Sequence, residues 1–160
     1  MVVYRETIRL STRKGVEAHD ITAHVEDAVR RSGVRQGLAS VFTPSSTSAI
    51  IANEFEPGLM QADIAAALER LFPEGLRYAH EERWHDGNGH SHVRATFLGQ
   101  SLTIPVVDAA PALGTWQQVV LLELDNKPRK REVLVTVVGE SSAASAVIDV
   151  AETARASRGC

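Results

Sequence analysis

Five strand-like segments follow one another between residues 76 and 138, and this run constrains the fold more than any other feature of the sequence. Each is rich in β-branched or other apolar residues, and turn-prone residues separate it from the next. The segments are residues 76–84, 91–98, 101–107, 115–124 and 131–138. Strands in direct succession do not build strand–helix–strand repeats. They therefore predict an α+β protein with a two-sheet β-sandwich.

The first half of the chain adds three strand-like segments and two helices. The strands are predicted at 2–12, 38–43 and 48–54. The first helix, at 20–33, places Ile21, Val25, Ala28 and Val29 on one face and ends at Gly33. The second helix, at 57–72, has a buried stripe of Met60, Ile64, Ala67, Leu68 and Leu71. We expect one domain over residues 1–140, followed by a small and polar C-terminal tail at 141–160.

Composition excludes several classes of partner. Apolar residues make up 44% and charged residues 23% of the 160-residue chain, which is typical of a globular protein. The net charge of -3 gives no field that would attract nucleic acid or an anionic membrane. No apolar run has the length of a signal peptide core or a membrane span. The only cysteine is Cys160, so no disulfide forms within the chain, and a cytoplasmic location is expected.

Histidines concentrate in one short stretch. Four of the six histidines lie between residues 80 and 92, around the turn sequence Asp-Gly-Asn-Gly. On a strand, His90, His92 and Arg94 would share one face, because side chains alternate. His80 on a neighbouring strand could complete a three-histidine metal site. The same face could instead bind a phosphate through Arg94, or the histidines could simply be solvated.

Other polar residues are weaker candidates. Glu54 ends a strand-like run, and Asp63 lies off the apolar stripe of the second helix, so either carboxylate could orient a ligand. The basic run at 127–131 is predicted to be a solvated hairpin turn rather than a phosphate site. Trp116 and Gln117 could stack on and hydrogen-bond a flat ligand, although composition favours Trp116 in the core. None of the common nucleotide-binding, zinc-protease or serine-hydrolase motifs is present.

Taken in order, these segments resemble the YjbQ-like family, which is described as a family of secondary thiamine-phosphate synthases. The resemblance covers nearly the whole chain except the last twenty residues. Its most specific part is a GTWQ sequence about a dozen residues after an SLTIPV strand. The matching stretches are 20–22, 41–50, 53–54, Asp63, 78–80, 86–106 and 113–135.

The resemblance implies a two-sheet sandwich that assembles as a homotrimer. A subunit interface would then explain strands that are apolar on both faces. It also implies transfer chemistry that joins a hydroxymethylpyrimidine diphosphate to a thiazole phosphate and releases pyrophosphate. A departing pyrophosphate needs cations, which a divalent metal (magnesium or zinc) or Arg94 would supply. The implied catalytic residues are Glu54, Asp63, His80 and His92; the implied substrate-binding residues are Ser45, Asn88, Arg94, Trp116 and Gln117; the implied metal ligands are His80, His90 and His92.

The sequence departs from the family pattern at two positions. Ser45 stands where many relatives have a histidine, and Ala109 stands where relatives commonly have a glycine that permits positive φ. Three hypotheses remain open from the sequence. The chain is a thiamine-phosphate synthase, a non-catalytic trimer that binds a metal or a small phosphorylated ligand, or a hydrolase that uses zinc-bound water.

Overall fold

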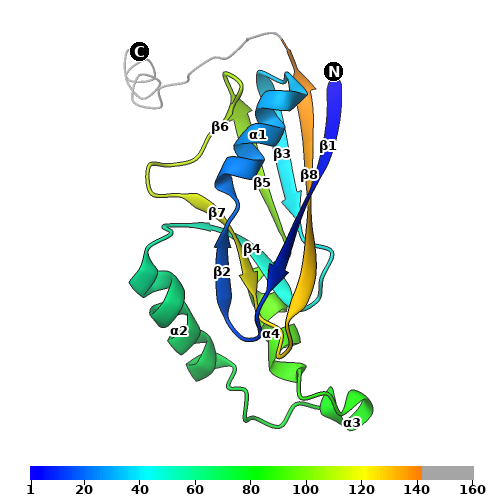
Figure 1. The fold of residues 1–160 in the computed structure, drawn as a ribbon, viewed down its shortest axis with the longest axis vertical. Helices are drawn as coiled ribbons and strands as arrows, with labels where there is room; N and C mark the ends of the chain where they lie inside the picture. The colour runs from blue at the N-terminus through cyan, green and yellow to red at the C-terminus, as the bar shows by residue number, and fades with distance from the viewer. Residues whose placement is uncertain (142–160) are drawn as a thin grey trace, which may run out of the picture.

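Two antiparallel sheets form the body of the molecule (Figure 1). The computed structural model describes residues 1–141, so nearly all of the predicted tail lies outside the described residues. The five-stranded sheet has the order β1 (Val2–Thr12), β8 (Arg129–Glu140), β3 (Gln36–Phe42), β5 (Ser101–Val107), β6 (Ala110–Pro111). The three-stranded sheet has the order β2 (Glu17–Asp20), β7 (Gln118–Glu123), β4 (Ser48–Asn53). The predicted α+β class is confirmed.

The helices are more numerous than the sequence predicts. The first, α1 (Thr22–Ser32), ends at Gly33, which has the left-handed φ of 69° expected there. The second begins with a π-helical turn, η1 (Leu59–Asp63), and continues as α2 (Ile64–Leu71). Two further helices, α3 (Glu81–Trp84) and α4 (Gly89–Leu98), follow. Within residues 1–141, no helix has the length and apolar character to span a membrane.

The prediction of strands at 76–84 and 91–98 is wrong, because these segments form turns, α3 and α4. In α4 the buried residues include Ser91, Arg94 and Ala95, a spacing that matches one face of a helix. Phe97, which alternation would place in the core, is 74% exposed. The alternation of apolar residues after His90 is therefore coincidental, and polar residues supply most of the buried face of this helix.

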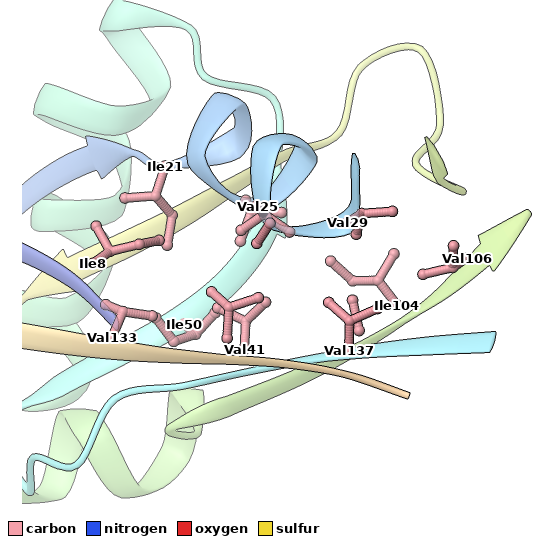
Figure 2. Packing of buried hydrophobic residues seen from close by; sticks show 14 of the residues in the cluster. Ile8, Ile21, Val25, Val29, Val41, Ile50, Ile104, Val106, Val133 and Val137 are labelled. Atoms are coloured by element: carbon pink, nitrogen blue, oxygen red, sulfur yellow. The ribbon is translucent and has the colours of Figure 1, made fainter. Parts of the chain in front are cut away.

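One hydrophobic core lies between the two sheets and beneath α1 (Figure 2). Its residues come from α1, from the inner face of the five-stranded sheet and from one face of the three-stranded sheet. Val25 and Val29 of α1 are fully buried, as the helical pattern predicts. The other members include Ile8, Val41, Ile50, Ile104, Val106, Val119, Leu121, Val133, Val135 and Val137. Burial of these side chains provides the main driving force for folding.

Strand β7 is buried on both faces within a single chain. Val119 and Leu121 belong to the core beneath α1. Val120 and Leu122 belong to a second cluster, with Met60 of η1, Leu68 of α2 and Ala95 of α4. A run as apolar as residues 118–124 is typical of a strand covered on both faces, and β7 is such a strand. The covering elements all belong to this chain: α1 and the five-stranded sheet cover one face, and η1, α2 and α4 cover the other. The apolar character of β7 therefore gives no reason to expect a subunit interface there.

The turn between β5 and β6 keeps a left-handed shape although alanine occupies it. Val107 and Ala110 pair across a two-residue hairpin whose central residues are Asp108 and Ala109. Their φ values are 50° and 66°, which is the pattern of a type I′ turn. Ala109 therefore has the positive φ that the glycine expected from the family resemblance would adopt freely, and the cost for alanine is backbone strain.

Candidate functional site

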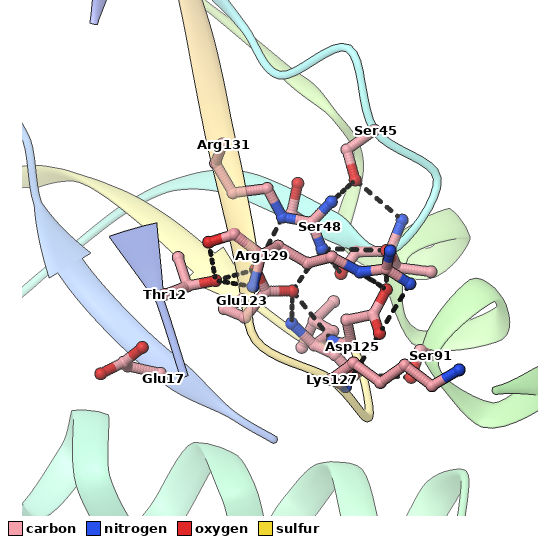
Figure 3. A network of polar contacts seen from close by, with 12 residues as sticks. Thr12, Glu17, Ser45, Ser48, Ser91, Glu123, Asp125, Lys127, Arg129 and Arg131 are labelled. Atoms are coloured by element: carbon pink, nitrogen blue, oxygen red, sulfur yellow. Dashed lines mark hydrogen bonds and ion pairs between the residues drawn. The ribbon is translucent and has the colours of Figure 1, made fainter. Parts of the chain in front are cut away.

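The inner surface of the strands changes from apolar to polar at one end of β7 and β8. Figure 3 shows the network of polar contacts at that end. Glu123, the last residue of β7, is fully buried. Its carboxylate accepts hydrogen bonds from Thr12 Oγ1 at 2.6 Å and from Arg131 Nε at 2.6 Å. It also accepts the backbone N–H groups of Leu124 and Asp125, both at 2.9 Å. A buried carboxylate is tolerated because all of these donors satisfy it.

Asp125 is the second buried carboxylate, with 1% of the residue exposed. It accepts hydrogen bonds from Thr47 Oγ1 at 2.8 Å and from the Lys127 N–H at 3.0 Å, and it pairs with Arg129 Nε at 2.9 Å. Burial by itself would raise the pKa of the Asp125 carboxyl. The hydrogen bonds from Arg129, Thr47 and Lys127 outweigh burial and lower that pKa, so Asp125 is ionised at neutral pH.

The basic run at 127–131 is solvated at residues 127–130, as the sequence predicts, but it joins strands of two different sheets rather than closing a hairpin, and Arg131 is not solvated. The Arg131 side chain is only 10% exposed and lies between Glu123 and the turn after β3. Its Nη1 donates to Ser45 Oγ at 2.7 Å, and its Nη2 donates to Thr47 Oγ1 at 3.0 Å. Alternation along β8 could have revealed this, because Arg129 and Arg131 share a strand face with Val133. The prediction fails at Arg131 because it considered the charge of the run and not the strand register.

Glu81, at the start of α3, fixes the conformation of the histidine-rich loop, residues 80–92. Its carboxylate accepts the backbone N–H groups of Gly87 at 2.6 Å and Gly89 at 2.8 Å. Burial alone would raise the pKa of the Glu81 carboxyl, but these bonds and His80 lower it overall. Gly89 begins α4 in close contact with Tyr78, because an added Cβ would lie 2.5 Å from Tyr78 Cβ. Only glycine fits at position 89, because a side chain there would clash with Tyr78.

His80, the first residue of this loop, lies close to the carboxylates of Glu81 and Asp86. Its Nδ1 is 3.3 Å from Glu81 Oε1 and 3.6 Å from Asp86 Oδ1. One donor atom from each of these three residues lies within 4.8 Å of the others. The His92 ring packs against the His80 ring, with centroids 4.5 Å apart. Burial, and then the neighbouring His80, lower the pKa of His92, which favours the neutral imidazole that binds metals.

Asp86, His92, Asp125 and Arg131 line an open cavity of about 310 Å³. The structure brings together three of the predicted site residues, Ser45, Asn88 and His92, and His80 adjoins them through Asp86 and His92. Sequence analysis missed most of the remaining lining, which consists of Pro44, Ser46, Thr47, Asp86, Asp125, Arg129 and Arg131. The arrangement combines imidazole and carboxylate donors with hydroxyl groups and guanidinium groups, as a metal and anion site does.

His90 and Arg94 do not join this site. The prediction that they share a face with His92 is wrong, because residues two apart on a helix point to opposite sides. The Arg94 side chain, 5% exposed, donates to Glu69 Oε2 at 2.7 Å and to the Phe72 carbonyl at 2.7 Å. It therefore ties α4 to the end of α2. The roles that the sequence assigned to His90 and Arg94 lose their geometric basis.

The remaining predicted residues also lie elsewhere. β4 and β7 pair Ser48 with Glu123 at one end and Asn53 with Gln118 at the other. Glu54, Trp116 and Gln117 therefore belong to the end of the three-stranded sheet that is far from Glu123. Trp116 is 70% exposed, so its expected place in the core is wrong. Gln117 Oε1 accepts the Gly114 N–H at 2.8 Å, which closes a local turn. Asp63 is exposed on η1.

Comparison with known proteins identifies the family to which this chain belongs. The family model for UPF0047 protein YjbQ-like matches residues 6–140. A UPF0047 protein of Methanothermobacter thermautotrophicus is 42% identical over 140 residues, which is 88% of this chain and 95% of that protein. A UPF0047 protein of Archaeoglobus fulgidus is 44% identical over 128 residues, 80% of this chain and 96% of that protein.

Solved structures agree with this comparison. A crystal structure of a YbjQ-like protein of unknown function from Sulfolobus solfataricus superposes with a TM-score of 0.82 at 38% identity, covering 86% of this chain and 98% of that one. A hypothetical protein from Aeropyrum pernix gives a TM-score of 0.75 at 34% identity, covering 84% and 99%. Sequence, fold and the resemblance through the histidine-rich loop lead to one conclusion: the chain belongs to the UPF0047 family of YjbQ-like proteins.

Proposed function

We propose that the cavity beside His80 and His92 binds a divalent cation, and that this cation in turn holds an anionic ligand that carries a phosphate group. The observation that carries the proposal is the convergence of His80, Glu81 and Asp86, whose donor atoms lie within 4.8 Å of one another. Mixed nitrogen and oxygen donors at this spacing suit a transition metal. His92, stacked against His80, could supply a further donor.

The charges around the cavity favour a cation as the first ligand. Four carboxylates lie in or beside it, and they face two guanidinium groups, those of Arg129 and Arg131. Arg131 is already neutralised by Glu123, and Arg129 by Asp125. An isolated anion would therefore meet a net negative surface. A divalent cation would neutralise the excess negative charge, so anion binding should depend on metal.

The donor set also favours one class of metal. Zinc and manganese accept imidazole nitrogen together with carboxylate oxygen, whereas magnesium prefers oxygen ligands and retains its water. We therefore expect Zn²⁺ or Mn²⁺ to bind more tightly than Mg²⁺. Glu81 already accepts two backbone N–H groups, which fixes its carboxylate before any metal arrives. Such outer contacts typically orient a metal ligand and strengthen its binding.

The groups available to the anion lie on the opposite wall. Ser45, Ser46 and Thr47 form a turn that lines the cavity, and the Arg129 side chain is 43% exposed. Hydroxyl groups and a partly free guanidinium suit the oxygen atoms of a phosphate. Ser45 is itself fixed by Arg131. The serine that replaces the histidine common in relatives thus takes part in the wall of the cavity.

Isothermal titration calorimetry with Zn²⁺ and Mn²⁺ tests the cation site. We expect wild type to bind one ion per chain, His80→Ala to weaken binding at least tenfold, and His24→Ala, an exposed histidine on α1, to bind as wild type does. Inorganic phosphate should then bind in the presence of Mn²⁺ and not after chelation. Equal metal affinity in wild type and His80→Ala would refute the cation site. Phosphate binding without metal would refute the charge argument.

A transferase that forms thiamine phosphate is the second candidate function. It is supported by the resemblance to the YjbQ-like family and by the presence of Arg129 beside the proposed metal ligands, since a departing pyrophosphate needs cations. The assay combines the two purified precursors with wild type and His92→Ala, with and without Mn²⁺ or Mg²⁺. We expect metal-dependent product with wild type and its loss in the variant. Equal product in both, or none, would dismiss this activity and leave the binding function intact.

We further propose that the chain forms a homotrimer through the outer face of the five-stranded sheet. This face carries apolar side chains that no element of residues 1–141 covers: Val3 is 52% exposed, Leu38 46%, Val107 42%, Phe42 40% and Leu134 38%. Register places them together, because Leu38 pairs with Val138 and Phe42 pairs with Leu134. An exposed apolar face of this kind commonly marks a protein interface.

Light scattering at micromolar concentration tests the assembly. A trimer has three times the monomer mass of 17.3 kDa. Leu38→Lys on the outer face should dissociate it, because a charge would be buried at the interface. Ala66→Lys, on the exposed side of α2, is the matched control and should leave the mass unchanged. A monomer mass for wild type would refute the trimer.

A further inference from the structure

A groove runs beside the free edge of β2. This strand is an outer strand of the three-stranded sheet, and among the described residues it pairs only with β7. Figure 1 shows the helix formed by η1 and α2 beside β2, with no strand between them. A cavity of about 640 Å³ follows this edge and is called the β2 groove below. Its walls are residues 13–14 of the β1–β2 turn, residues 16–19, and Phe55, Pro57, Met60 and Gln61.

Every second residue along β2 directs its backbone groups away from β7. Ile21 donates its N–H to the Val119 carbonyl at 2.9 Å, and Gly15 bonds to the segment after β7 in the same way. In an antiparallel pair, residues that exchange hydrogen bonds with the partner strand alternate with residues that do not. The odd-numbered residues therefore bond to β7, whereas the N–H and C=O groups of Val16 and Ala18 point out of the sheet. Both of these residues line the β2 groove.

Other outer strands offer less to an incoming strand. The edge of β4 is partly occupied, because Ile50 donates its N–H to the Gly99 carbonyl at 3.1 Å. β6 has only two residues. β1 is long, but Arg5 and Arg9 are exposed on it, and such charged residues hinder pairing at an edge. β2 combines outward backbone groups with a cavity beside them.

The end of the β2 groove near Gly15 is positively charged. Glu17 is the one carboxylate in its walls, and it is already occupied. It accepts the Arg13 N–H at 2.6 Å and Arg13 Nε at 2.7 Å, and His19 Nε2 lies 3.0 Å from it. Lys14 is exposed and forms no ion pair within residues 1–141. An acidic group on a ligand would therefore find an unpaired cation at this end.

The other end of the β2 groove is apolar. Phe55 is 38% exposed, and Pro57 is exposed beside it in the chain. The Phe55 N–H donates to Gln118 Oε1 at 2.8 Å, and Asp20 pairs with Val120. Because Gln118 precedes Val120 on β7, Phe55 lies at the Asp20 end of β2. A ligand in the groove thus meets an aromatic ring at one end and a lysine at the other.

We propose that the β2 groove binds an extended segment of another protein, which adds to β2 as an antiparallel strand and carries an apolar residue followed by an acidic residue. Backbone hydrogen bonds to Val16 and Ala18 supply affinity, and the two ends of the groove supply specificity. Antiparallel pairing places the apolar residue at Phe55 and the acidic residue at Lys14. A strand of four residues spans about 13 Å, so these two residues are about four positions apart. This site is separate from the proposed cation site and does not depend on it.

A fluorescein-labelled peptide, acetyl-Phe-Thr-Val-Thr-Glu-amide with the dye on its N-terminal side, tests the charge arrangement. Fluorescence polarisation with the full-length protein measures its affinity. We expect saturable binding, and about fivefold weaker binding when lysine replaces the glutamate. Equal affinity for the two peptides, or no binding of either, would overturn the proposal.

Backbone N-methylation tests strand addition directly. One peptide is methylated at its second and fourth nitrogens and another at its third and fifth, which are matched in composition. Alternate N–H groups of a strand point to opposite sides, so only one of the two sets faces β2. We expect one peptide to lose binding and the other to keep it within about twofold. The same result for both peptides would exclude a strand in the groove.

Variants locate the binding on the protein. Ala18→Pro removes an outward N–H and leaves the pairing with β7, so it should weaken peptide binding at least about tenfold. Lys14→Glu should reverse the preference, so that the lysine peptide binds better. Lys130→Glu makes the same charge change on β8, outside the groove, and should keep the wild-type preference.

Circular dichroism checks that each variant folds, and Lys14→Glu decides the outcome if Ala18→Pro does not. Unchanged peptide binding in folded Ala18→Pro, or an unchanged preference in Lys14→Glu, would overturn the proposal. A wild-type assembly that light scattering shows to be lost in folded Ala18→Pro would place a second copy of the chain on this edge, and the proposed partner would then be wrong.

Discussion

The two halves of β8 present very different side chains to the interior. In the half near α1, Val133, Val135 and Val137 are fully buried in the hydrophobic core. On the same strand face, two and four residues earlier, Arg131 and Arg129 meet buried carboxylates instead. β7 changes in the same way, because Val119 and Leu121 are followed on that face by Glu123. One strand pair therefore carries an apolar core at one end and an ionic core at the other.

The difference separates a half that serves stability from a half that borders the proposed binding site. Apolar burial is non-directional, so the valine half gains free energy from any side chains of suitable volume. The ionic half requires desolvation of several charges and depends on geometry, and buried ion pairs are often no more stable than apolar replacements. A chain that needed only stability could continue the valines. The ionic half borders the cavity that contains His92, and the proposed binding function would account for its presence.

We expect the largest loss of stability when one member of a buried ion pair in the ionic half is replaced and its partner is kept. Glu123→Leu should lower the free energy of unfolding by about 3–5 kcal/mol, because Arg131 would remain buried without its main partner. The double variant Glu123→Leu with Arg131→Met removes both charges and should regain most of that loss. Urea denaturation of the two single variants and the double variant measures the coupling. A double variant that lost the sum of the two single effects would contradict this account.

The apolar half should respond differently. Val135→Ala removes two buried carbon atoms and should cost about 2 kcal/mol through lost burial and the resulting cavity. Zn²⁺ affinity should not change, because Val135 is in the core beneath α1 and not in the cavity. Denaturation and calorimetry on the same variant check both statements. Weaker metal binding would mean that the two halves are mechanically coupled, and the contrast drawn between them would not hold.

Sequence patterns predicted the apolar half well. The strands at 2–12 and 101–107 and the helix face of Val25 and Val29 were found, because alternation and helical spacing of apolar residues are local signals. α3 and α4 were missed. In α4 the buried face is largely polar, and hydrogen bonds to Glu81, Glu69 and Phe72 stabilise the helix and its ends. Such partners are distant in sequence, so no local pattern reveals them.

The candidate site was predicted only in part for the same reason. His80 and His92 were identified because histidines are rare and were clustered. Arg131 was overlooked because a basic run beside a turn usually faces solvent, and only pairing with Glu123 overrides that tendency. Trp116 was expected in the core because of its size, yet it is exposed in the loop before β7. A ligand set depends on which segments meet in space, and a single sequence gives this weakly.

A pH titration distinguishes the polar region from the apolar one. The pKa of His90 is lowered from its ordinary value of 6.5 by burial and then by Arg94, with Glu69, Glu74 and Glu81 acting in the opposite direction. The unfolded chain therefore binds a proton that the folded chain does not. Stability is full above pH 6.5 and should fall as the pH drops below it, by at most about 1.4 kcal/mol per pH unit for this group.

The measurement is urea denaturation in the presence of a chelator between pH 7.5 and pH 5. His90→Phe should flatten the dependence, while Val135→Ala should shift the whole curve and keep its slope. His92, whose pKa is also lowered, should account for part of the remaining slope. The carboxyls of Glu81 and Asp125 have pKa values below their ordinary ones, so they act at lower pH than this window. An unchanged slope in His90→Phe would mean that His90 is not held neutral.

The smallest effect is expected at the β5–β6 turn, which is remote from both halves of β8. Ala109 has a φ of 66°, a conformation that costs an alanine roughly 1 kcal/mol and a glycine almost nothing. Ala109→Gly should therefore raise the free energy of unfolding by about 0.5–1 kcal/mol, since the greater freedom of glycine in the unfolded chain offsets part of the gain. Ala110→Gly, next to it in β6, lacks positive φ and should lose stability instead. Metal affinity should be unchanged in both. If both substitutions changed the free energy of unfolding in the same direction, backbone strain at Ala109 would not be the cause of the effect.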